Sequence, residues 1–584
     1  MLKQDYYNDF FEIGQLKINF SLFELGLPDD DPVYTLKKVM EDLDFSGLLA
    51  CYSDKGRTGF NPIMLYSVVT YANMRGVRAV DRIVELCERD LAFIWLTKGQ
   101  KPKRDVFYDF KGKKLTGEVL DELNYQFMRR LEKEGFITLK ELYIDGTKIE
   151  ANANRYTFVW RGTLNYHLAG LLDTIDTLYA EYNTFLHENG YGPRYDLGDA
   201  HMFVIEGMDK VRKVIEKNRK RKITKHKKIP NNTIIEIDNC SPLEILNLQR
   251  NLMRIAEGEG IVFVSGKGKH KPEIQKLYEE LEKCGSRLME YKECFEIMGK
   301  DRNSYSKTDL EATFMRMKED HMQNGQLKAA YNVQIAVENY FIVHSYVSND
   351  RTDYNTLIPV LEKHRSAFGD TLETVTADSG YCSEKNLLYL KENGIRSFIK
   401  LQDHEKRKTR AYKEDIGKYY NMTYAVFEDE HYYICHDGRE LHHIRTESKE
   451  QDGYTQTVEV YGCMDCSGCE HKAQCIYRYN AQRNPDRNKV MKINERWEEL
   501  KEESNTNIQS EEGILKRQTR SIQTEGHFGD IKENENFRRF NYRSEEKVYK
   551  EFMLYAMGRN IMKYHRFLQH EIEKYEGKKE QKTA

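Results

Sequence analysis

The pattern of hydrophobic and polar positions starts as a helical one. Residues 1 to about 135 carry apolar residues at helical spacing, as in the run from Ile63 to Met74, which follows the helix-start signal Asn61-Pro62. This pattern predicts a helical N-terminal domain over residues 1–135. Two roles are open for it, because the pattern is typical both of a bundle that packs against other parts of a protein and of a DNA-binding headpiece.

A short strand and a second helical region follow. Residues 142–149, LYIDGTKI, surround Asp145 with β-forming residues, so we take residues 136–160 as the first piece of an α/β core. Residues 161–327 are predicted to be a helical insertion with a dense basic block at 210–228. A charge run is usually a solvated helix face, but one this dense and single-signed favours phosphate contact. Its candidate DNA-binding residues are Arg219, Lys220, Arg221 and Lys222.

The strand pattern returns in residues 328–400. The predicted elements are strands at 330–338 and 341–347, a helix at 353–368, a strand at 373–378, a helix at 384–393 and a strand at 395–400. Together with the strand around Asp145, this order predicts a mixed α/β sheet.

The last third of the chain begins with an interruption of this core. Residues 401–510 alternate like strands and carry a cysteine cluster, residues 511–570 are predicted to be C-terminal helices of the core, and residues 571–584 are a polar tail. The cluster is Cys463, Cys466, Cys469 and Cys475, with Cys435 and His471 as reserve ligands. Thiols this close predict a structural Zn²⁺ site. An iron–sulfur cluster and loosely grouped free thiols are the alternatives.

Composition narrows the class of protein. The chain has 584 residues, 39% of them hydrophobic, and no apolar stretch near the roughly 20 residues that cross a bilayer, so we expect no membrane association. Eleven cysteines, an odd number and mostly scattered, favour a reducing compartment. No signal-peptide pattern opens the chain, and we expect a cytoplasmic protein. The net charge of −3 does not exclude nucleic acid, because the charge is unevenly distributed.

Two aspartates lie within predicted strands. Asp145 in LYIDGTKI and Asp378 in TVTADSGY stand among residues that favour strands, where Asp is disfavoured. A buried carboxylate is costly unless its charge is compensated, and Mg²⁺ prefers carboxylate oxygens. Each aspartate alone could cap a turn. Together, on adjacent strands of one sheet, they indicate a metal site.

A third ligand is expected from the C-terminal helices. Glu525 and Lys532 are seven residues apart, which places them on one face of an α-helix. The carboxylate would hold metal while Lys532 meets a phosphate, and Arg517 and Arg520 are further candidate phosphate contacts. The alternative is a solvated helix with ion pairs.

The segments 143–148 (YIDGTK), 376–381 (TADSGY) and 525–529 (EGHFG) resemble the DDE transposases of bacterial insertion sequences. The long insertion after the first strand is similar to one branch of that group. The resemblance implies a ribonuclease-H-like core with Asp145, Asp378 and Glu525 as catalytic triad and ligands of two Mg²⁺ ions, which Mn²⁺ can replace. The family signature Tyr-x-x-Arg-x-x-x-Glu-x-x-x-x-x-x-Lys is met in part, since Gln518 and Ser521 occupy its Tyr and Arg positions.

The resemblance also implies the reaction and its partners. Two metal ions would support an in-line displacement, with water as nucleophile for strand cleavage and the freed 3′-OH as nucleophile for strand transfer. The implied partners are double-stranded DNA, as terminal inverted repeats and target, and a second copy of the chain. A catalytically silent DNA-binding protein derived from a transposase, and a metal-dependent nuclease of the same fold, are the alternatives. The presence of all three acids favours the enzyme.

Overall fold

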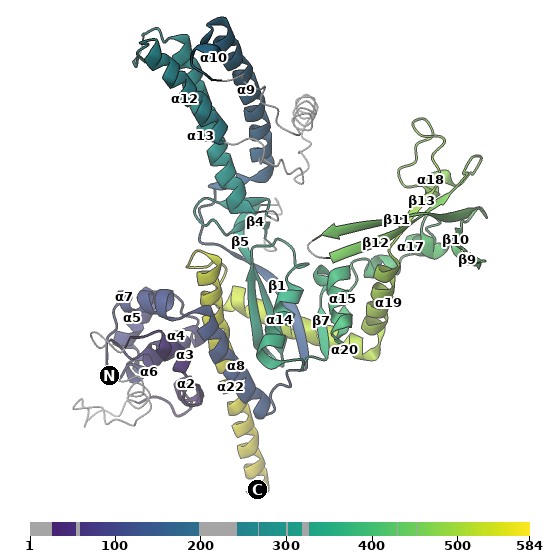
Figure 1. Ribbon diagram of the computed structural model, residues 1–584. Helices are drawn as coiled ribbons and strands as arrows, with labels where there is room; N and C mark the ends of the chain where they lie inside the picture. The colour runs from purple at the N-terminus through teal and green to yellow at the C-terminus, as the bar shows by residue number, and fades with distance from the viewer. Residues whose placement is uncertain are drawn as a thin grey trace.

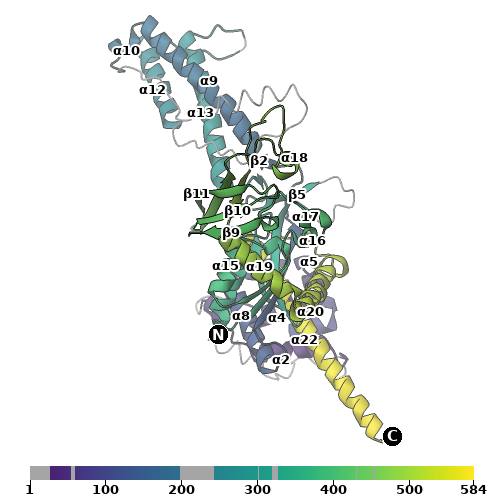
Figure 2. The same cartoon turned by 90° about the vertical axis from the view of Figure 1, so that its right-hand side faces the viewer.

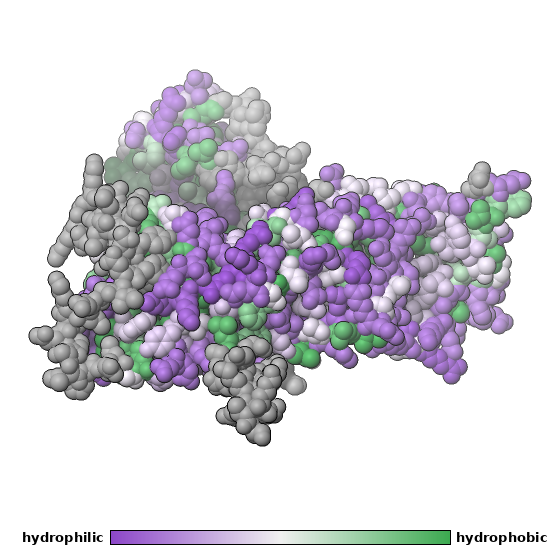
Figure 3. Space-filling model, turned by 90° about the horizontal axis from the view of Figure 1, so that it is seen from below, coloured by the Kyte–Doolittle hydropathy of each residue, from purple (hydrophilic) through white to green (hydrophobic). Residues whose placement is uncertain are grey.

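The computed structural model describes residues 26–53, 59–197, 242–266, 268–299, 302–317, 326–428, 430–451 and 454–583. Within these ranges, no helix is long and apolar enough to cross a membrane. Hydrophilic residues dominate the face shown in Figure 3, with hydrophobic ones scattered among them.

The N-terminal region is helical, as its pattern predicted. Its elements are α2 (Pro32–Glu41), α3 (Ser46–Ala50), α4 (Pro62–Met74), α5 (Val80–Arg89), α6 (Leu91–Leu96), α7 (Arg104–Asp109), the π-helix η1 (Phe110–Lys114) and α8 (Gly117–Lys133). Helix α4 starts where the sequence indicates, because the Asn61 side chain accepts hydrogen bonds from the amides of Ile63 and Met64. Every residue of α4 is buried, and the helix packs against the C-terminal helix α22 (Glu545–Thr583).

The core is a mixed sheet. Its strands are β1 (Glu141–Glu150), β4 (Thr313–Arg316), β5 (Leu327–Glu338), β6 (Phe341–Ser348), β7 (Thr374–Ala377) and β8 (Arg396–Ile399). Strand β5 pairs with β1, β4 and β6 in antiparallel fashion, whereas β7 runs parallel to β1 and β8 parallel to β7. The order β6-β5-β1-β7-β8 is joined through α14 (Leu357–Phe368), η2 (Ser379–Tyr381) and α15 (Glu384–Glu392). The strands and helices predicted for residues 328–400 are confirmed, whereas β4 is a core strand within the stretch 161–327 that was predicted to be helical.

The two faces of this sheet lie against different hydrophobic clusters. Side chains such as Ile144 and Val343 join the N-terminal helices, α14 and α15 on one face. Tyr331 and Ile335, on the other face, pack against Phe537 and the N-terminal third of α22. Figure 1 shows α22 running beside α8 and extending beyond the rest of the fold to the C-terminus. Because successive side chains of β5 point to opposite faces of the sheet, they contribute to a hydrophobic cluster on each face.

A helical arm separates β1 from β5. It contains β2 (Phe158–Trp160), α9 (Arg161–Glu188), α10 (Tyr191–Arg194), α12 (Pro242–Gly258), α13 (Glu273–Met298) and β3 (Ser304–Ser306). The helices α9, α12 and α13 share their own hydrophobic cluster, and they project away from the core sheet (Figures 1 and 2). The candidate residues Arg219, Lys220, Arg221 and Lys222 lie outside the described residues.

A second sheet follows β8. Short helices α16 (His404–Arg407), α17 (Arg410–Lys413) and η3 (Tyr419–Asn421) lead into the strands β9 (Thr423–Phe427), β10 (Glu430–Ile434), β11 (Glu440–Gln451), β12 (Tyr454–Cys463) and β13 (Val490–Ile493). These strands form an antiparallel sheet in the order β13-β12-β11-β10-β9, with α18 (Lys472–Cys475) in the connection before β13.

The chain then returns to the core through α19 (Glu495–Gln509) and α20 (Glu511–Arg520). From Ser521 the helix continues as the π-helix η4 (Ser521–Glu525), α21 (Gly526–Gly529) and the π-helix η5 (Asp530–Asn534). The sequence predicted an uninterrupted α-helix here. π-Helical turns inside helices are frequent at functional sites, and they change which side chains share a face.

Candidate functional site

Two carboxylates lie side by side where parallel strands β1 and β7 meet. Asp145 is on β1 and is 6% exposed, and Asp378 directly follows β7. Ile144 pairs with Ala377 in the parallel register. Asp145 follows Ile144 and Asp378 follows Ala377, so the two aspartates occupy adjacent positions on the two strands. Adjacent strands are about 5 Å apart. The juxtaposition that the sequence predicted is therefore present in the backbone.

Asp145 has a cationic partner from the C-terminal helices. Its Oδ2 lies 3.0 Å from Arg520 Nη1 and accepts a hydrogen bond from Thr524 Oγ1 at 3.2 Å, and its Oδ1 accepts one from the Gly146 amide at 2.8 Å. The two side chains of the ion pair are 9% and 15% exposed. Arg520, predicted to contact a phosphate, is thus the counter-ion of the buried carboxylate in this structure.

Asp378 lies near a second acid that the sequence had not assigned to the site. The Asp378 carboxylate accepts a hydrogen bond from the Gly380 amide at 2.7 Å. A Cβ atom on Gly380 would lie 2.9 Å from Asp378 Oδ1 and 3.1 Å from Asp353 Oδ2, so these two oxygens are within about 6 Å of each other. Asp353 follows a strand and begins a predicted helix, a position that is typical of a helix cap. Its side chain instead accepts hydrogen bonds from Asn332 Nδ2 at 2.7 Å and Gln334 Nε2 at 2.9 Å.

A buried polar network underlies these acids. Gln334 is fully buried and also accepts a hydrogen bond from the hydroxyl of Tyr381, which is buried as well. Burial raises the pKa of Tyr381 well above its ordinary value, and Asp353, Asp145 and Asp378 raise it further in that order. Tyr381 therefore remains a neutral hydrogen-bond donor within electrostatic reach of three carboxylates.

Gly146 has a steric role in this network. It faces Gln334 across the β1–β5 pair, and the Gln334 amide occupies the place where a side chain on residue 146 would begin. Only glycine leaves room for Gln334 to cross β1 and reach Tyr381. This contact explains why glycine, and not a larger residue, occupies position 146 between Asp145 and Thr147.

Glu525 is differently placed. It is the last residue of η4, directly after Thr524, and its side chain is exposed. Within the described residues, no three His, Cys, Asp or Glu side chains are close enough to hold a metal ion. The structure places Asp145 and Asp378 at neighbouring positions of β1 and β7, places Asp353 near Asp378, and leaves Glu525 exposed. Its assignment as third metal ligand stays a prediction.

The expectation that Glu525 and Lys532 share a helix face is wrong. Lys532 is 7% exposed, whereas Glu525 is exposed, because two π-helical segments lie in the run that was taken as regular α-helix. A phosphate could contact Lys532 only after a conformational change that exposes this side chain. Arg517 is partly buried, and its Nε has no hydrogen-bond partner among the described residues.

The cysteine cluster gathers at the end of β12. Cys463 and Cys466 are buried, whereas Cys469, Cys475 and Cys435 are partly exposed. The amide of Lys489 donates to Cys466 Sγ at 3.4 Å, and Cys463 Sγ donates to the Asp465 carbonyl at 3.2 Å. Burial raises the pKa of Cys463 to about 11, with contributions from Cys466 and Cys435. The Zn²⁺ site stays a prediction.

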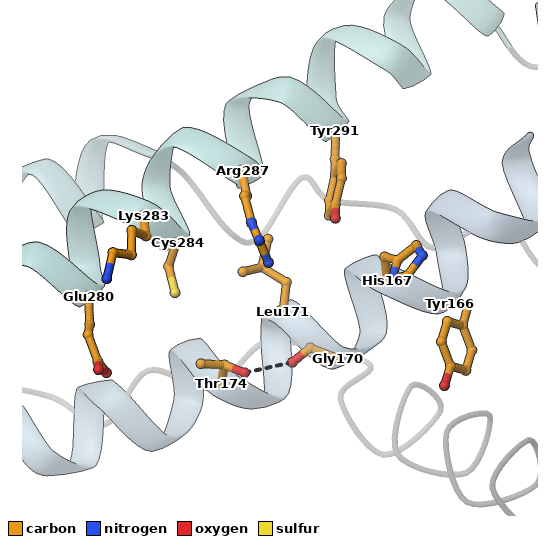
Figure 4. Close-up of a pocket in the computed structure, with 10 residues that line it drawn as sticks. All are labelled: Tyr166, His167, Gly170, Leu171, Thr174, Glu280, Lys283, Cys284, Arg287 and Tyr291. Atoms are coloured by element: carbon orange, nitrogen blue, oxygen red, sulfur yellow. Dashed lines mark hydrogen bonds between the residues drawn. The ribbon is translucent and has the colours of Figure 1, made fainter. Parts of the chain in front are cut away.

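A groove in the helical arm lies apart from these acids. Figure 4 shows residues of α9 and α13 facing each other across it, with Arg287 pointing toward Leu171. The Thr174 hydroxyl donates to the Gly170 carbonyl of its own helix. The groove is not lined by Asp145, Asp378 or Asp353, and we assign it no role.

Sequence reasoning missed Asp353, Gln334, Tyr381 and Thr524. One signal was available: Asn332 and Gln334 are two residues apart in an otherwise apolar strand, so both point to the same face of the sheet. Polar side chains paired in this way mark a place where a buried strand meets a polar site. Nothing in the sequence indicates that Asp353 folds back onto them.

Comparisons with known proteins agree with the resemblance. A transposase DDE domain family matches residues 434–565, a range that includes the cysteine cluster and Glu525. A second family, transposase domain (DUF772), matches residues 22–113 in the N-terminal helices. No curated protein and no solved structure matches the chain. Both matched families are transposase families, and together they support an insertion-sequence DDE transposase.

Proposed function

We propose that this protein is a Mg²⁺-dependent transposase that binds the ends of its element and catalyses DNA strand cleavage and strand transfer. The observation that carries the proposal is the position of Asp145 within β1, beside Asp378 at the end of the parallel strand β7. The strand order β6-β5-β1-β7-β8, with β7 and β8 parallel to β1, supports a ribonuclease-H-like core. Carboxylate oxygens are the donors that Mg²⁺ prefers.

Each residue of the site has a proposed task. Asp145 and Asp378 would hold the divalent ions, and Glu525 would complete the coordination of the second ion. Bound there, the ions would activate the attacking oxygen and stabilise the leaving oxygen of a phosphodiester displacement. Since Arg520 neutralises Asp145 in the free chain, that guanidinium has to move or share the carboxylate when metal binds. Rotation of η4 would carry Glu525 toward the aspartates.

The test is a cleavage assay on DNA that carries the element's terminal repeats, with Mg²⁺. We expect Asp145→Asn and Asp378→Asn to lose at least 100-fold in cleavage rate, about 2.7 kcal/mol of transition-state stabilisation, with unchanged DNA affinity. Asp370→Asn is the matched control, because Asp370 is a 77% exposed residue paired with Arg365. Full activity in either catalytic-site variant would refute the assignment.

One observation favours a second candidate, a transposase-derived DNA-binding protein without catalysis. Asp145 is already paired with Arg520, and Glu525 faces outward. Joined DNA products would exclude this candidate and also a simple nuclease. Bound but uncut DNA at saturating Mg²⁺ would support it.

Further parts of the proposal follow from the reaction. We infer a homodimer, because two ends of the element must be paired, and action on chromosomal DNA in the cytoplasm. We also infer that residues 1–135 and the basic block around Arg219 contribute DNA contacts. Zn²⁺ bound by Cys463, Cys466, Cys469 and Cys475 would stabilise the loop between β12 and β13.

A further inference from the structure

A cavity lies beside Glu525, between the helix that carries it and α22. Its lining includes Tyr340, Gln523, Gly526, His527, Lys563 and Arg566. Gly526 directly follows Glu525, so the cavity opens next to the proposed third metal ligand. No task has been given to this cavity in the proposed reaction.

The charges of the cavity favour an anion. Lys563 and Arg566 both come from α22, and neither forms an ion pair with a described side chain. Arg559, one turn earlier, is paired with both Asp530 and Glu535. Burial lowers the pKa of Lys563, and the charges of Arg566 and Arg559 lower it further. A bound anion would relieve this repulsion.

The wall of the cavity is fixed to the core sheet by the helix of Glu525. Tyr340 lies in the turn between β5 and β6 with φ of 64°, a conformation rare for a bulky residue. His527 Nε2 donates to the Tyr340 carbonyl at 2.9 Å, and Gln523 Oε1 accepts from the Tyr340 amide at 3.1 Å. Lys563 Nζ lies 4.4 Å from the centre of the Tyr340 ring. Asn339 and Tyr340 both have positive φ, as a two-residue hairpin turn requires, and the two side chains fix this turn against the helix of Glu525.

The wall also has hydrogen-bonding capacity that the free chain does not use. His527 is 6% exposed, and its Nδ1 has no hydrogen-bond partner among the described residues. The Nε of Arg559 and the Oε2 of Glu535 are also buried and have no hydrogen-bond partner among the described residues. Because His527 Nε2 donates to Tyr340, its Nδ1 is an acceptor, as is Glu535 Oε2, so these two atoms call for water, and only the Nε of Arg559 can donate to an anion.

Gly526 leaves one side of the cavity open. Its φ of −57° is helical, and a Cβ atom there would meet nothing within 4 Å. Glycine inside a helix costs about 1 kcal/mol relative to alanine, and no packing contact requires it here. Gly529 is equally helical and equally open, but it does not line the cavity.

We propose that this cavity binds one backbone phosphate of the DNA strand that occupies the active site. Lys563 and Arg566 contact the phosphate oxygens, and Gly526 lets the sugar–phosphate backbone approach the helix. The phosphate is thereby held next to Glu525. This contact sets the position of the DNA strand relative to Asp145 and Asp378. The identity of the ligand as DNA rests on the proposed function, whereas the cavity and its charges do not.

The first test is the salt dependence of DNA binding by the full chain. A fluorescent duplex of about 30 bp is titrated in EDTA, so that no cleavage occurs, at several NaCl concentrations. Each lost phosphate contact reduces the slope of log K against log [NaCl] by about 0.9. We expect that change for Lys563→Ala and for Arg566→Ala. Lys391→Ala is the control, because Lys391 is 51% exposed and already paired with Glu503.

The second test separates the cavity from general surface charge. Gly526→Leu fills the opening without changing charge, and we expect it to weaken duplex binding as much as Lys563→Ala does. Gly529→Leu, on the same helix, should leave binding unchanged. Thermal denaturation checks that both variants fold.

An unchanged slope for both cation variants, equal binding by the two glycine variants, or no duplex binding by the wild-type chain would overturn the proposal. These results are independent of the cleavage assay. If Asp145→Asn still cleaves DNA while Lys563→Ala loses its phosphate contact, the catalytic assignment fails and the cavity stands.

Discussion

Replacing Arg520 with methionine tests whether this arginine stands in for a metal at Asp145. The substitution leaves a carboxylate that is 9% exposed without its cation at 3.0 Å. Breaking a largely buried ion pair by removing one partner costs about 3 kcal/mol. Thr524 and the Gly146 amide still donate to Asp145, so the fold persists with reduced stability. We expect a lower thermal denaturation midpoint in EDTA.

Magnesium should then recover part of this loss. A ligand that binds only the folded chain stabilises it by RT ln(1 + [L]/Kd), which is about 1.4 kcal/mol at a tenfold excess over Kd. With Arg520 absent, Asp145 is free to bind Mg²⁺, so the midpoint of Arg520→Met should rise more steeply with Mg²⁺ than that of the wild type.

The matched control is Arg396→Met, which removes an exposed pair with Glu512 whose side chains are 56% and 44% exposed. Exposed pairs contribute less than about 1 kcal/mol, and no Mg²⁺ response is expected from this variant. Equal stability losses in the two variants, or the same Mg²⁺ response in Arg520→Met and wild type, would refute the idea that Arg520 and metal compete.

Three further predictions address the network and the core. Asp353→Asn should lower the rate of Mg²⁺-dependent cleavage at least tenfold with unchanged duplex affinity; a wild-type rate would remove Asp353 from the site. Gly146→Ala should displace Gln334 and cost about 1–3 kcal/mol in a urea denaturation series. Burial lowers the pKa of His364 to about 4. Burial also lowers the pKa of its hydrogen-bonded neighbour His344 well below its ordinary value. Both remain neutral in the fold, so stability is complete above pH 6.5 and is lost as the pH falls toward 4, by about 2 kcal/mol at pH 5 for His364 alone; a denaturation midpoint that stays flat from pH 7 to 5 would contradict this.

The sequence was sufficient for the part of the site that depends on strand order. Asp145 and Asp378 each follow a short run of β-forming residues on strands that were predicted to be neighbours in one sheet, so their meeting could be predicted. The periodicity of α4 and its Asn61 cap were readable for the same reason: the signals are local.

The remaining features depend on contacts between distant residues. Arg520 reaches Asp145 from a helix hundreds of residues away in the chain, and no local pattern distinguishes it from Arg517. Asp353 was assigned to a helix cap because its neighbours look like a helix start, whereas its side chain folds back onto β5. The face of Glu525 was predicted with 3.6 residues per turn, and the π-helical turns make that period inapplicable.

These exceptions have a common electrostatic cause. Asp145, Asp378 and Asp353 each act electrostatically on the buried Tyr381, and Asp378 lies near Asp353, so the fold has to accommodate several negative charges around one residue. Arg520 supplies that cation at Asp145, while neutral amides of Asn332 and Gln334 hold Asp353 in place. The chain thereby folds around a concentrated negative charge before any metal arrives. A site stabilised in this way keeps Asp145 and Asp353 oriented, and the proposed reaction then requires that metal replace the guanidinium of Arg520 and that the exposed Glu525 approach the aspartates.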